Sequence, residues 1–361
     1  MMREELLRDR SVLLIQKPGV EDHQRTWCFW EQEQGFFENI VYRKWPVLYF
    51  FSRGFSRTLP ISPYQYKMIR GEDFYRHCWN ELSKYPNIHR LEGEVQEISK
   101  HDGRLSVAVN GERHQFDNTY AFNSIPAFAA KEKEGIRLLQ HFKGWFVKAT
   151  EPVFQPGRAT LMDFRVSQQH GTAFVYVMPF DERHALVEYT LFTAALLKQE
   201  EYDEALSAYL RENLHVNDFT ITDTEFGIIP MTDARFQFHR DGLFHIGSAG
   251  GQTKASSGYT FQFIQKQSAQ IVDYLRKGIA LTGMPGSPVR FRFYDNTLLN
   301  VLHRGKPGGD AIFTALFKNN EPQAVLRFLD NESSWRDERR IITSLPKWPF
   351  LRAGLRQILS R

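Results

Sequence analysis

The stretch Gly242–Gln267, GLFHIGSAGGQTKASSGYTFQFIQKQ, constrains the fold more than any other part of the 361-residue chain. It predicts a short strand at Leu243–Ile246, a loop of small residues at Gly247–Gly258, and a helix that continues to about Leu275. Glycines let backbone N–H groups approach a ligand closely, and a helix N-terminus favours negative charge. The stretch therefore indicates an anion site between a sheet and a helix, although Gly/Ser-rich turns also occur where no ligand binds.

Composition excludes several classes of protein. The net charge is only +4 and the basic residues are interspersed with acidic ones, so the sequence has no stripe for nucleic acid. Cys28 and Cys78 have neither CxxC nor Cys/His spacing, which argues against a metal site or a disulfide framework and favours a reducing cytoplasm. No apolar run reaches the roughly 18–20 residues that span a bilayer. The 30 phenylalanines fit either a Phe-rich core or a wide cavity for a large hydrophobic substrate.

Several motifs occur in an order that points to one family. They are LLIQK (13–17), RTWCFW (25–30), TLMDFR (160–165), FVYVMPF (174–180), LVEYTLF (186–192), GIIPMTD (227–233), FYDNTLLNVL (293–302) and IFTALFKNNEPQAVLRFLD (312–330). Together with Gly242–Gln267, they resemble the lycopene cyclases, a branch of the FAD-dependent oxidoreductase-like superfamily. The resemblance runs from Ser11 to about Pro349, and Gly242–Gln267 is similar to the second flavin-contacting segment of that family.

The resemblance implies a mixed α/β fold. We expect an FAD/NAD(P)-binding Rossmann-like domain, N-terminally incomplete, intertwined with an antiparallel-sheet substrate domain and followed by a C-terminal helical region. The Rossmann-like domain and its β-meander are expected at 1–60, 92–142 and 235–285, the substrate domain at 61–91 and 143–234, and the helical region at 286–361.

The first residues depart from the family pattern. Ser11–Lys17, SVLLIQK, predicts a fully buried parallel strand after a short helix end at Arg3–Leu7. In a dinucleotide-binding unit this would be the second strand, and the first strand with its GxGxxG turn would need roughly 30 preceding residues. We therefore expect the pyrophosphate loop to be missing, through a downstream start site or a truncated gene. Gln16 stands where an acidic residue normally binds the adenosine ribose, and Gln can still hydrogen-bond a hydroxyl.

Periodic patterns predict the other elements. VQEIS and RLSVAVN are joined by His101-Asp102-Gly103, and an Asp-Gly turn is typical of a hairpin. Strands are predicted at Tyr120–Ile125, Trp145–Thr150, Arg158–Val166, Ala173–Pro179, His184–Phe192 and Phe219–Pro230, with the middle four in an antiparallel sheet. Helices are predicted at Gln65–Lys84, Tyr202–Asn213, Asp295–His303, Asp310–Lys318 and Gln323–Leu329.

Glu188 is the candidate catalytic residue. In HALVEYTLF both strand faces are largely apolar, so the strand should be buried on both sides. A buried carboxyl must be paired, neutral or functional, and loss of hydration raises its pKa and makes it a proton donor. The alternative is a structural pair with an arginine such as Arg165. The resemblance places Glu188 on the glutamate that lycopene cyclases use as their acid–base residue.

Other residues surround this candidate. Thr190 and Tyr176 could orient the carboxyl and contact substrate, or serve as ordinary sheet residues. Asp163 could be a second carboxyl, or a partner for Arg165. Arg25 and Trp27 match a family segment near the flavin and are assigned to cofactor and substrate, the alternative being a loop anchored by a buried Trp.

The cofactor contacts are expected in the small-residue loop. They are Ile246, Gly247, Ser248, Ala249, Gly250, Gly251 and Gly258, joined by Gln16 and Arg25. Lys254 could neutralise cofactor charge or remain solvated.

The resemblance implies a lycopene β-cyclase that works without net redox change. Glu188 would protonate the terminal double bond of an acyclic ψ-end group, the carbocation would close a ring, and a proton would be lost to give a β-ionone ring. Reduced FAD would be required, with NAD(P)H only as its reductant. The alternatives are a flavin-dependent hydroxylase or isoprenoid reductase, and a non-catalytic carotenoid-binding protein.

The C-terminal segment Pro346–Arg361 combines basic and apolar residues. PKWPFLRAGLRQILSR has four basic residues, no acidic ones, and several large apolar side chains. This is typical of an interfacial helix attracted to anionic lipids, or of a helix packed on the protein with a solvated basic face. We expect a peripheral protein on the inner face of the cell membrane.

Overall fold

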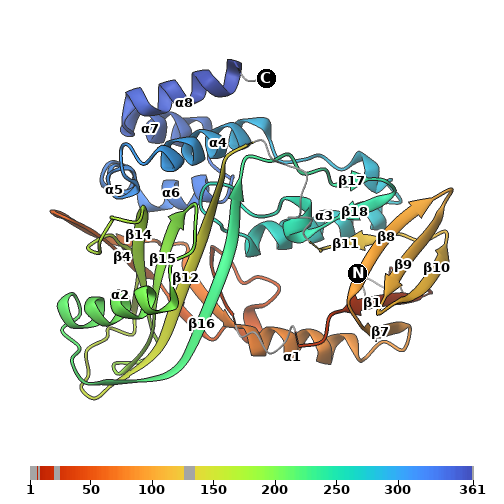
Figure 1. Ribbon diagram of the computed structural model, residues 1–361, viewed down its shortest axis with the longest axis horizontal. Helices are drawn as coiled ribbons and strands as arrows, with labels where there is room; N and C mark the ends of the chain where they lie inside the picture. The colour runs from red at the N-terminus through yellow and green to blue at the C-terminus, as the bar shows by residue number, and fades with distance from the viewer. Residues whose placement is uncertain (1–5, 7–8, 20–24, 126–134, 360–361) are drawn as a thin grey trace.

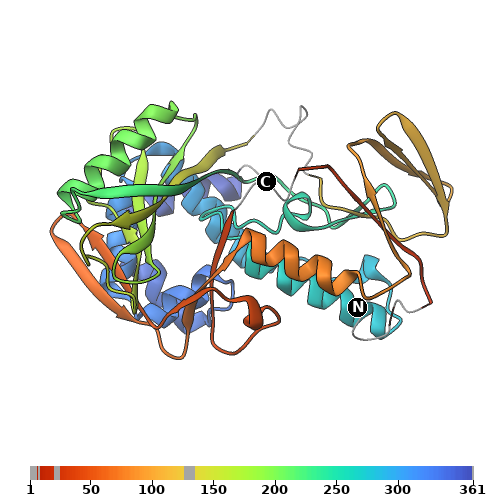
Figure 2. The same cartoon turned by 90° about the horizontal axis from the view of Figure 1, so that it is seen from below.

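The computed structural model describes residues 6, 9–19, 25–125 and 135–359. A large sheet with helices on both faces lies on one side of the molecule, and several small sheets lie on the other (Figure 1). The helices are α1 (Gly71–Leu82), α2 (Gln199–Glu212), α3 (Phe261–Arg276), α4 (Val289–Arg304), α5 (Gly309–Asn319), α6 (Pro322–Leu329), α7 (Trp335–Ser344) and α8 (Lys347–Leu359). Helices α1 and α3 lie between the large sheet and the small ones (Figure 2).

The large sheet has the strand order β16-β12-β15-β14-β13-β4-β5. Its strands are β4 (Val47–Ser52), β5 (Phe55–Pro60), β12 (Arg137–Ala149), β13 (Arg158–Asp163), β14 (Thr172–Pro179), β15 (His184–Thr193) and β16 (Phe219–Thr232). The four predicted antiparallel strands are confirmed as β12 to β15, although β12 begins well before Trp145. Strand β13 also pairs in parallel with β4.

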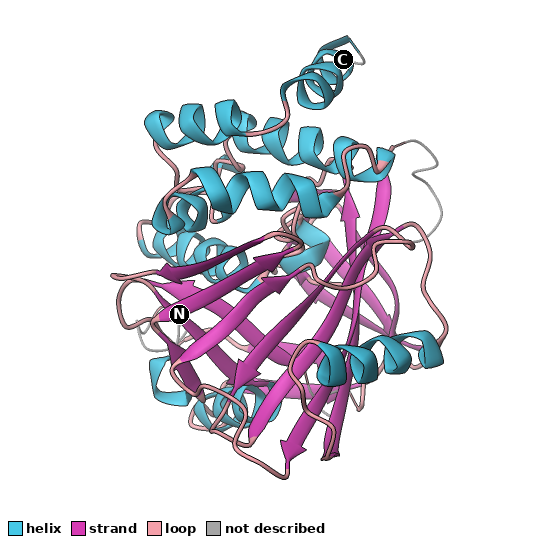
Figure 3. Cartoon of the chain, turned by 90° about the vertical axis from the view of Figure 1, so that its left-hand side faces the viewer, coloured by secondary structure: helices cyan, strands magenta, loops and turns pink. Residues whose placement is uncertain are grey.

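Apolar residues cover both faces of this sheet. Helix α2 packs on one face, where Tyr202 and Leu206 are completely buried against Val187 of β15. The C-terminal helices gather over the other face (Figure 3), where the ring centroids of Phe50 and Phe317 lie 4.8 Å apart. Many of the phenylalanines therefore build an interdigitated core between the sheet and the C-terminal helices.

The small sheets hold the segments assigned to nucleotide binding. They are formed by β1 (Val12–Gln16) with β7 (Ile88–Glu92), by β8 (Val95–His101), β9 (Arg104–Val109) and β10 (Glu112–Asp117), and by β11 (Phe122–Asn123), β17 (His239–Arg240) and β18 (Leu243–His245). The predicted hairpin joins β8 to β9 with both turn residues at positive φ, 50° at Asp102 and 81° at Gly103.

Strand β1 is parallel to β7, as predicted, but it is not fully buried. Leu13 is 37% exposed, and within the described residues β1 has a hydrogen-bonded neighbour on one edge only. The predicted helix end at Arg3–Leu7 lies almost entirely outside the described residues.

The predicted helix at Gln65–Lys84 is wrong in its first part. Residues Gln65–Arg70 form strand β6, which pairs with β2 (Thr26–Glu31) on one side and β3 (Arg43–Trp45) on the other. Strand pairing on both edges overrides the helical pattern there. The helix begins at Gly71, where a Cβ would lie only 2.6 Å from the carbonyl oxygen of Arg25.

The C-terminal region is helical, as predicted, with one helix more than the pattern indicated. Helix α7 was not predicted, although Ser334 and Asp337 form a capping box at its start. None of the helices in the described part of the chain has the length and apolar content needed to cross a bilayer.

Candidate active site

Glu188 lies in the middle of β15, where both strand faces are buried as the sequence predicted. Its neighbours in the ladder are Tyr176 of β14 and Gly144 of β12. The residue is only 8% exposed, and Thr190 Oγ1 donates a hydrogen bond of 2.8 Å to Glu188 Oε1. The Glu188 carboxyl group is therefore largely shielded from water.

A second buried carboxyl group, on Glu225, is the partner of Glu188. Glu225 lies on β16 and also pairs with Gly144, so the two glutamates flank one glycine. A Cβ at Gly144 would lie 2.9 Å from Glu225 Cγ and 2.8 Å from Leu186 Cδ1. The absence of a side chain at Gly144 therefore makes room for the two carboxyl groups to meet.

The two glutamates hold their protons unequally. Burial raises the pKa of Glu188 well above its usual value, and the charge of Glu225 raises it further. Burial also raises the pKa of Glu225, but the backbone N–H and the hydroxyl of Thr26 donate to this carboxylate at 2.9–3.1 Å and act in the opposite direction. Glu188 is therefore the member of the pair that keeps a proton more readily, and Glu225 the member that ionises more readily.

Neutral polar groups surround Glu188. Burial raises the pKa of the Cys28 thiol and of the Tyr66 and Tyr176 hydroxyls well above their usual values, so all three are uncharged at neutral pH. Burial raises the pKa of Tyr259 as well, and Glu188 contributes to that shift. Since Tyr259 directly follows Gly258, the glycine-rich loop leads into the surroundings of Glu188.

The alternative partner Arg165 does not approach Glu188. Arg165 Nη2 lies 2.6 Å from Asp163 Oδ2, and the hydroxyl of Tyr209 donates to the same oxygen at 2.8 Å. Asp163 is therefore the partner of Arg165 and faces α2, while Glu225 supplies the second carboxyl group. The sequence analysis missed Glu225, and its only local signal was an acidic residue immediately before the apolar run FGII.

The small-residue loop has the predicted place between β18 and α3. Gly247–Gly250 form a 3₁₀ turn, and Gly247, Gly251 and Gly258 have φ values of 58–71° that favour glycine. A Cβ at Gly250 would lie 2.2 Å from the carbonyl oxygen of His245. The loop therefore depends on glycine where it turns.

Among the described residues, the buried polar atoms near this loop that have no hydrogen-bond partner include Trp27 Nε1 and Ser257 Oγ. The ring of Trp27 packs on Phe261, the first residue of α3, at 5.3 Å between centroids. Buried donors are normally paired, so these atoms indicate a missing partner. A flavin at the loop fits both observations.

The other predicted cofactor residues lie in different places. Lys254 is neither solvated nor free, since its Nζ lies 2.6 Å from Asp295 Oδ1 and 2.6 Å from Asn331 Oδ1. Gln16 ends β1 in a separate sheet, where its carbonyl accepts from Gly93. Arg25 is exposed beside Thr26.

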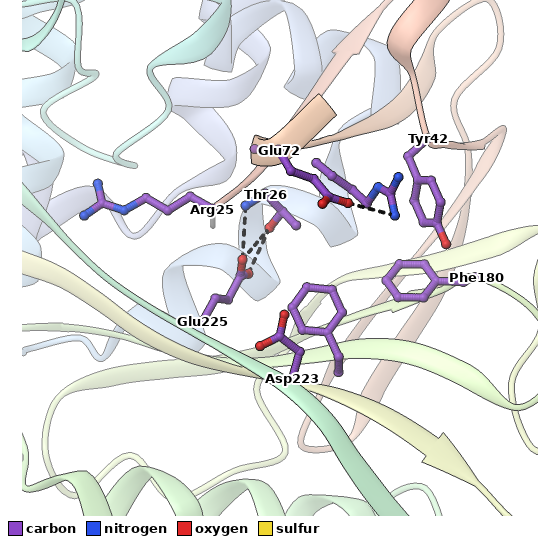
Figure 4. Close-up of a pocket in the computed structure, with 10 residues that line it drawn as sticks. Arg25, Thr26, Tyr42, Glu72, Phe180, Asp223 and Glu225 are labelled. Carbon is purple, nitrogen blue, oxygen red and sulfur yellow. Dashed lines mark hydrogen bonds and ion pairs between the residues drawn. The ribbon is translucent and has the colours of Figure 1, made fainter. Parts of the chain in front are cut away.

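A pocket of about 160 Å³ opens next to the carboxyl pair. Arg25, Arg70, Glu72 and Asp223 line it together with Glu225. Figure 4 shows the carboxylate of Glu225 turned toward Thr26, while the guanidinium of Arg25 extends away from it. The pocket thus combines charged side chains with the aromatic residues Tyr42, Phe146 and Phe180, whereas the groups around Glu188 are uncharged.

Solved structures with a similar fold include flavoenzymes. The flavin-dependent brominase Bmp2 has a TM-score of 0.59 at 13% identity, over 99% of this chain and 95% of the other. PqsL, described as a probable FAD-dependent monooxygenase from Pseudomonas aeruginosa, has a TM-score of 0.57 at 15% identity, over 89% of this chain and 94% of the other. At these identities the similarity establishes the fold alone, which is the predicted FAD-binding Rossmann-like α/β class.

Sequence comparison then defines the family. The family model for lycopene cyclase protein matches residues 5–355, and the chain therefore belongs to the lycopene cyclase family. The lycopene beta-cyclase of Paracoccus sp. (strain N81106 / MBIC 01143) is 27% identical over 235 residues, 58% of this chain. That match spans little more than half of the relative, 57% of its length.

Proposed function

We propose that this protein is a lycopene β-cyclase that converts ψ-end groups of lycopene to β-ionone rings. The observation that carries the proposal is the buried Glu188, whose pKa burial raises well above its usual value and which lies near Tyr259 at the end of the glycine-rich loop. We further propose the division into Rossmann-like, substrate and C-terminal regions predicted from the sequence. Membership of the family supports a carotenoid substrate.

Proton transfer is the central task of the site. Glu188 donates its proton to the terminal double bond, and the resulting tertiary carbocation closes onto the neighbouring double bond. The ring cation then loses a proton to the carboxylate, so the reaction has no net redox change. Thr190 holds the carboxyl in place by its hydrogen bond, Tyr176 flanks it on the neighbouring strand, and the packed apolar faces of the sheet exclude water that would trap the cation.

We propose reduced FAD as the cofactor, with NAD(P)H serving only as the reductant of the flavin. Ile246–Gly251 and Gly258 would contact it through the backbone, while Trp27 Nε1 and Ser257 Oγ supply free donors. A bound reduced flavin supplies negative charge that stabilises a developing cation.

Pigment analysis in lycopene-accumulating bacterial cells tests the function. The expected product is a cyclic carotenoid of unchanged mass, because cyclisation only isomerises the substrate. A gain of hydrogen would instead indicate an isoprenoid reductase, and a gain of oxygen a hydroxylase. Unchanged lycopene with a well-folded, flavin-loaded protein would contradict all three activities and favour a non-catalytic carotenoid-binding protein.

Gly250→Ala should remove the flavin from the purified protein. The new Cβ would meet the backbone oxygen of His245 at 2.2 Å, and a backbone atom has little room to move. We expect flavin absorbance per protein to fall about tenfold or more, since a shift of roughly 1.4 kcal/mol already changes binding tenfold. Gly283→Ala is the control, because open space surrounds that Cβ. Equal flavin content in both variants would contradict the loop assignment.

We also propose that α8 binds the membrane surface. Its buried residues are small, Ala353 and Gly354, while large apolar residues point outward, with Trp348 75% and Leu355 58% exposed. The helix carries basic residues and no acidic ones, and it lies at the outer end of the helical group (Figure 3). This arrangement favours a surface rich in anionic lipid over a helix whose apolar residues pack on the protein.

Leu351→Glu/Leu355→Glu should weaken vesicle binding. Both leucines are more than half exposed, and insertion of two such side chains contributes at least about tenfold to affinity. The measurement is co-sedimentation with phosphatidylglycerol/phosphatidylcholine vesicles, compared with phosphatidylcholine alone. The matched control is Ile279→Glu, a 47% exposed apolar residue outside α8. Equal losses in both proteins would contradict a specific role of α8.

A further inference from the structure

The two glutamates of the carboxyl pair have different surroundings. Glu188 is enclosed by Tyr176, Tyr66 and Cys28, and it does not line the pocket of Figure 4. Glu225 lines that pocket and also contacts Glu188. Within the described residues, Glu225 is therefore the titratable group that connects the pocket with the proton donor.

The charged side chains in one part of the pocket wall suit it to hold water, beside a part formed by Tyr42, Phe146 and Phe180. Asp223 and Glu72 face it with their carboxylates, and Arg70 Nη1 lies 3.1 Å from Glu72 Oε1. Thr26 donates to both oxygens of Glu225 and so fixes the orientation of this carboxylate at the wall. Water in the pocket can thus meet one side of Glu225, while the other side meets Glu188.

We propose that Glu225 is the proton relay of the site, exchanging protons with water in the pocket and with Glu188 over Gly144. This inference rests on the proposed cyclase function. Glu225 acts through Glu188 and does not touch substrate, so it is a positioning and relay residue. Gly144 permits the exchange because no side chain separates the two carboxyl groups.

The proton balance of the relay closes over one turnover. Glu188 gives its proton to a carbon of the substrate, and the ring cation returns a different proton to Glu188. Between turnovers this proton passes to the Glu225 carboxylate and on to water, while a proton from water follows the reverse path. The pair begins and ends with one proton, and no oxidant or reductant takes part.

Cyclisation in D₂O tests the relay. Membranes or vesicles that contain lycopene are incubated in D₂O with the flavin-loaded protein, and the product is analysed by mass. The wild type should place one deuterium in each new ring, because Glu188 receives a deuteron from solvent before each donation. In Glu225→Gln, Glu188 should reuse the proton it recovered from substrate, and the labelled fraction should fall by about an order of magnitude.

Two further variants separate the relay from a structural role. Asp223→Asn removes a neighbouring pocket carboxylate and should keep the wild-type labelling, while Glu225→Asp retains a carboxyl group and should restore it. The labelled fraction is measured per product molecule, so a smaller yield of folded protein does not change it.

The outcomes distinguish the two proposals. Absence of a cyclic isomer from the wild type contradicts the proposed function. A cyclic product without solvent deuterium from the wild type overturns the relay without the need for any variant. Equal labelling in Glu225→Gln and the wild type also overturns it, as does an equal loss in Asp223→Asn.

Discussion

Glu188→Gln should abolish the formation of cyclic carotenoid in lycopene-accumulating cells. Glutamine has the same shape and can donate to the Glu225 carboxylate, but it has no acidic proton to give. General acid catalysis typically contributes about 10²–10⁴-fold to a rate, and the pKa of the Cys28 thiol and of the Tyr66 and Tyr176 hydroxyls is raised, which makes these groups much weaker acids than a carboxyl group. The measurement is the ratio of cyclic product to lycopene by chromatography. Residual conversion above about one tenth of the wild type would contradict the assignment.

The stability of Glu188→Gln is measured as a control, and the direction in which its free energy of unfolding changes can be predicted. The pKa of Glu188 is higher in the folded protein than in the unfolded chain. The contribution of Glu188 to the free energy of unfolding is therefore fully present at a pH below the unfolded pKa. It is lost as the pH rises through the folded pKa. Glutamine cannot ionise, so Glu188→Gln should be at least as stable as the wild type, with an advantage that grows toward alkaline pH. Tyr189→Phe, a change on the opposite face of β15, should leave conversion unchanged. Loss of stability in Glu188→Gln would show that the residue is mainly structural.

Lys254→Met should destabilise the protein by about 3–5 kcal/mol, because it leaves a buried carboxylate without its cation. The Lys254 side chain is 2% exposed and that of Asp295 is 11% exposed, with their charged atoms 2.6 Å apart. After the substitution, the neutral Ser256 hydroxyl at 2.7 Å from Asp295 cannot replace the lost charge. Urea unfolding monitored by circular dichroism gives the free energy of unfolding.

The matched double variant Lys254→Met/Asp295→Leu should recover most of this loss. Replacement of a buried ion pair by apolar side chains is often close to neutral, whereas removal of one partner is not. A double variant as unstable as Lys254→Met would contradict this explanation and indicate that the lost contacts themselves stabilise the loop. A single variant within about 1 kcal/mol of the wild type would show that Asp295 becomes protonated or hydrated at little cost.

Elements defined by local chemistry could be predicted from the sequence. The Asp102-Gly103 turn fixes a hairpin by its own backbone preference, and HALVEYTLF predicts a strand buried on both faces. The glycine-rich loop was placed correctly between a strand and a helix, because a run of small residues favours a turn over a strand or a helix. The helix predicted at Gln65–Lys84 was wrong in its first part. Gln65–Arg70 pairs with β2 and β3, which lie elsewhere in the sequence, and the local pattern gives no sign of that pairing.

The candidate site was predicted only in part, for the same reason. Glu188 is marked by its own strand, but Glu225 meets it only because β12 lies between β15 and β16 in the sheet. Most side chains in the first half of β16 are exposed, so no burial pattern marked its carboxyl group. Lys254 is buried because Asp295 of a later helix covers it, and the sequence near Lys254 gives no sign of that contact. Both contacts join segments that are far apart in the sequence, so local patterns could not predict them.

The glycine between the two glutamates has a consequence for the evolution of this family. A Cβ at Gly144 would lie under 3 Å from Leu186 Cδ1 and Glu225 Cγ, so a mutation that adds a side chain would force at least one of these side chains to move. The acid pair then depends on Gly144 as well as on Glu188 and Glu225, and changes at these three positions should occur together. Under the proposed relay, loss of the glycine would also remove the reason to keep Glu225, so the two positions together would mark relatives that share this chemistry.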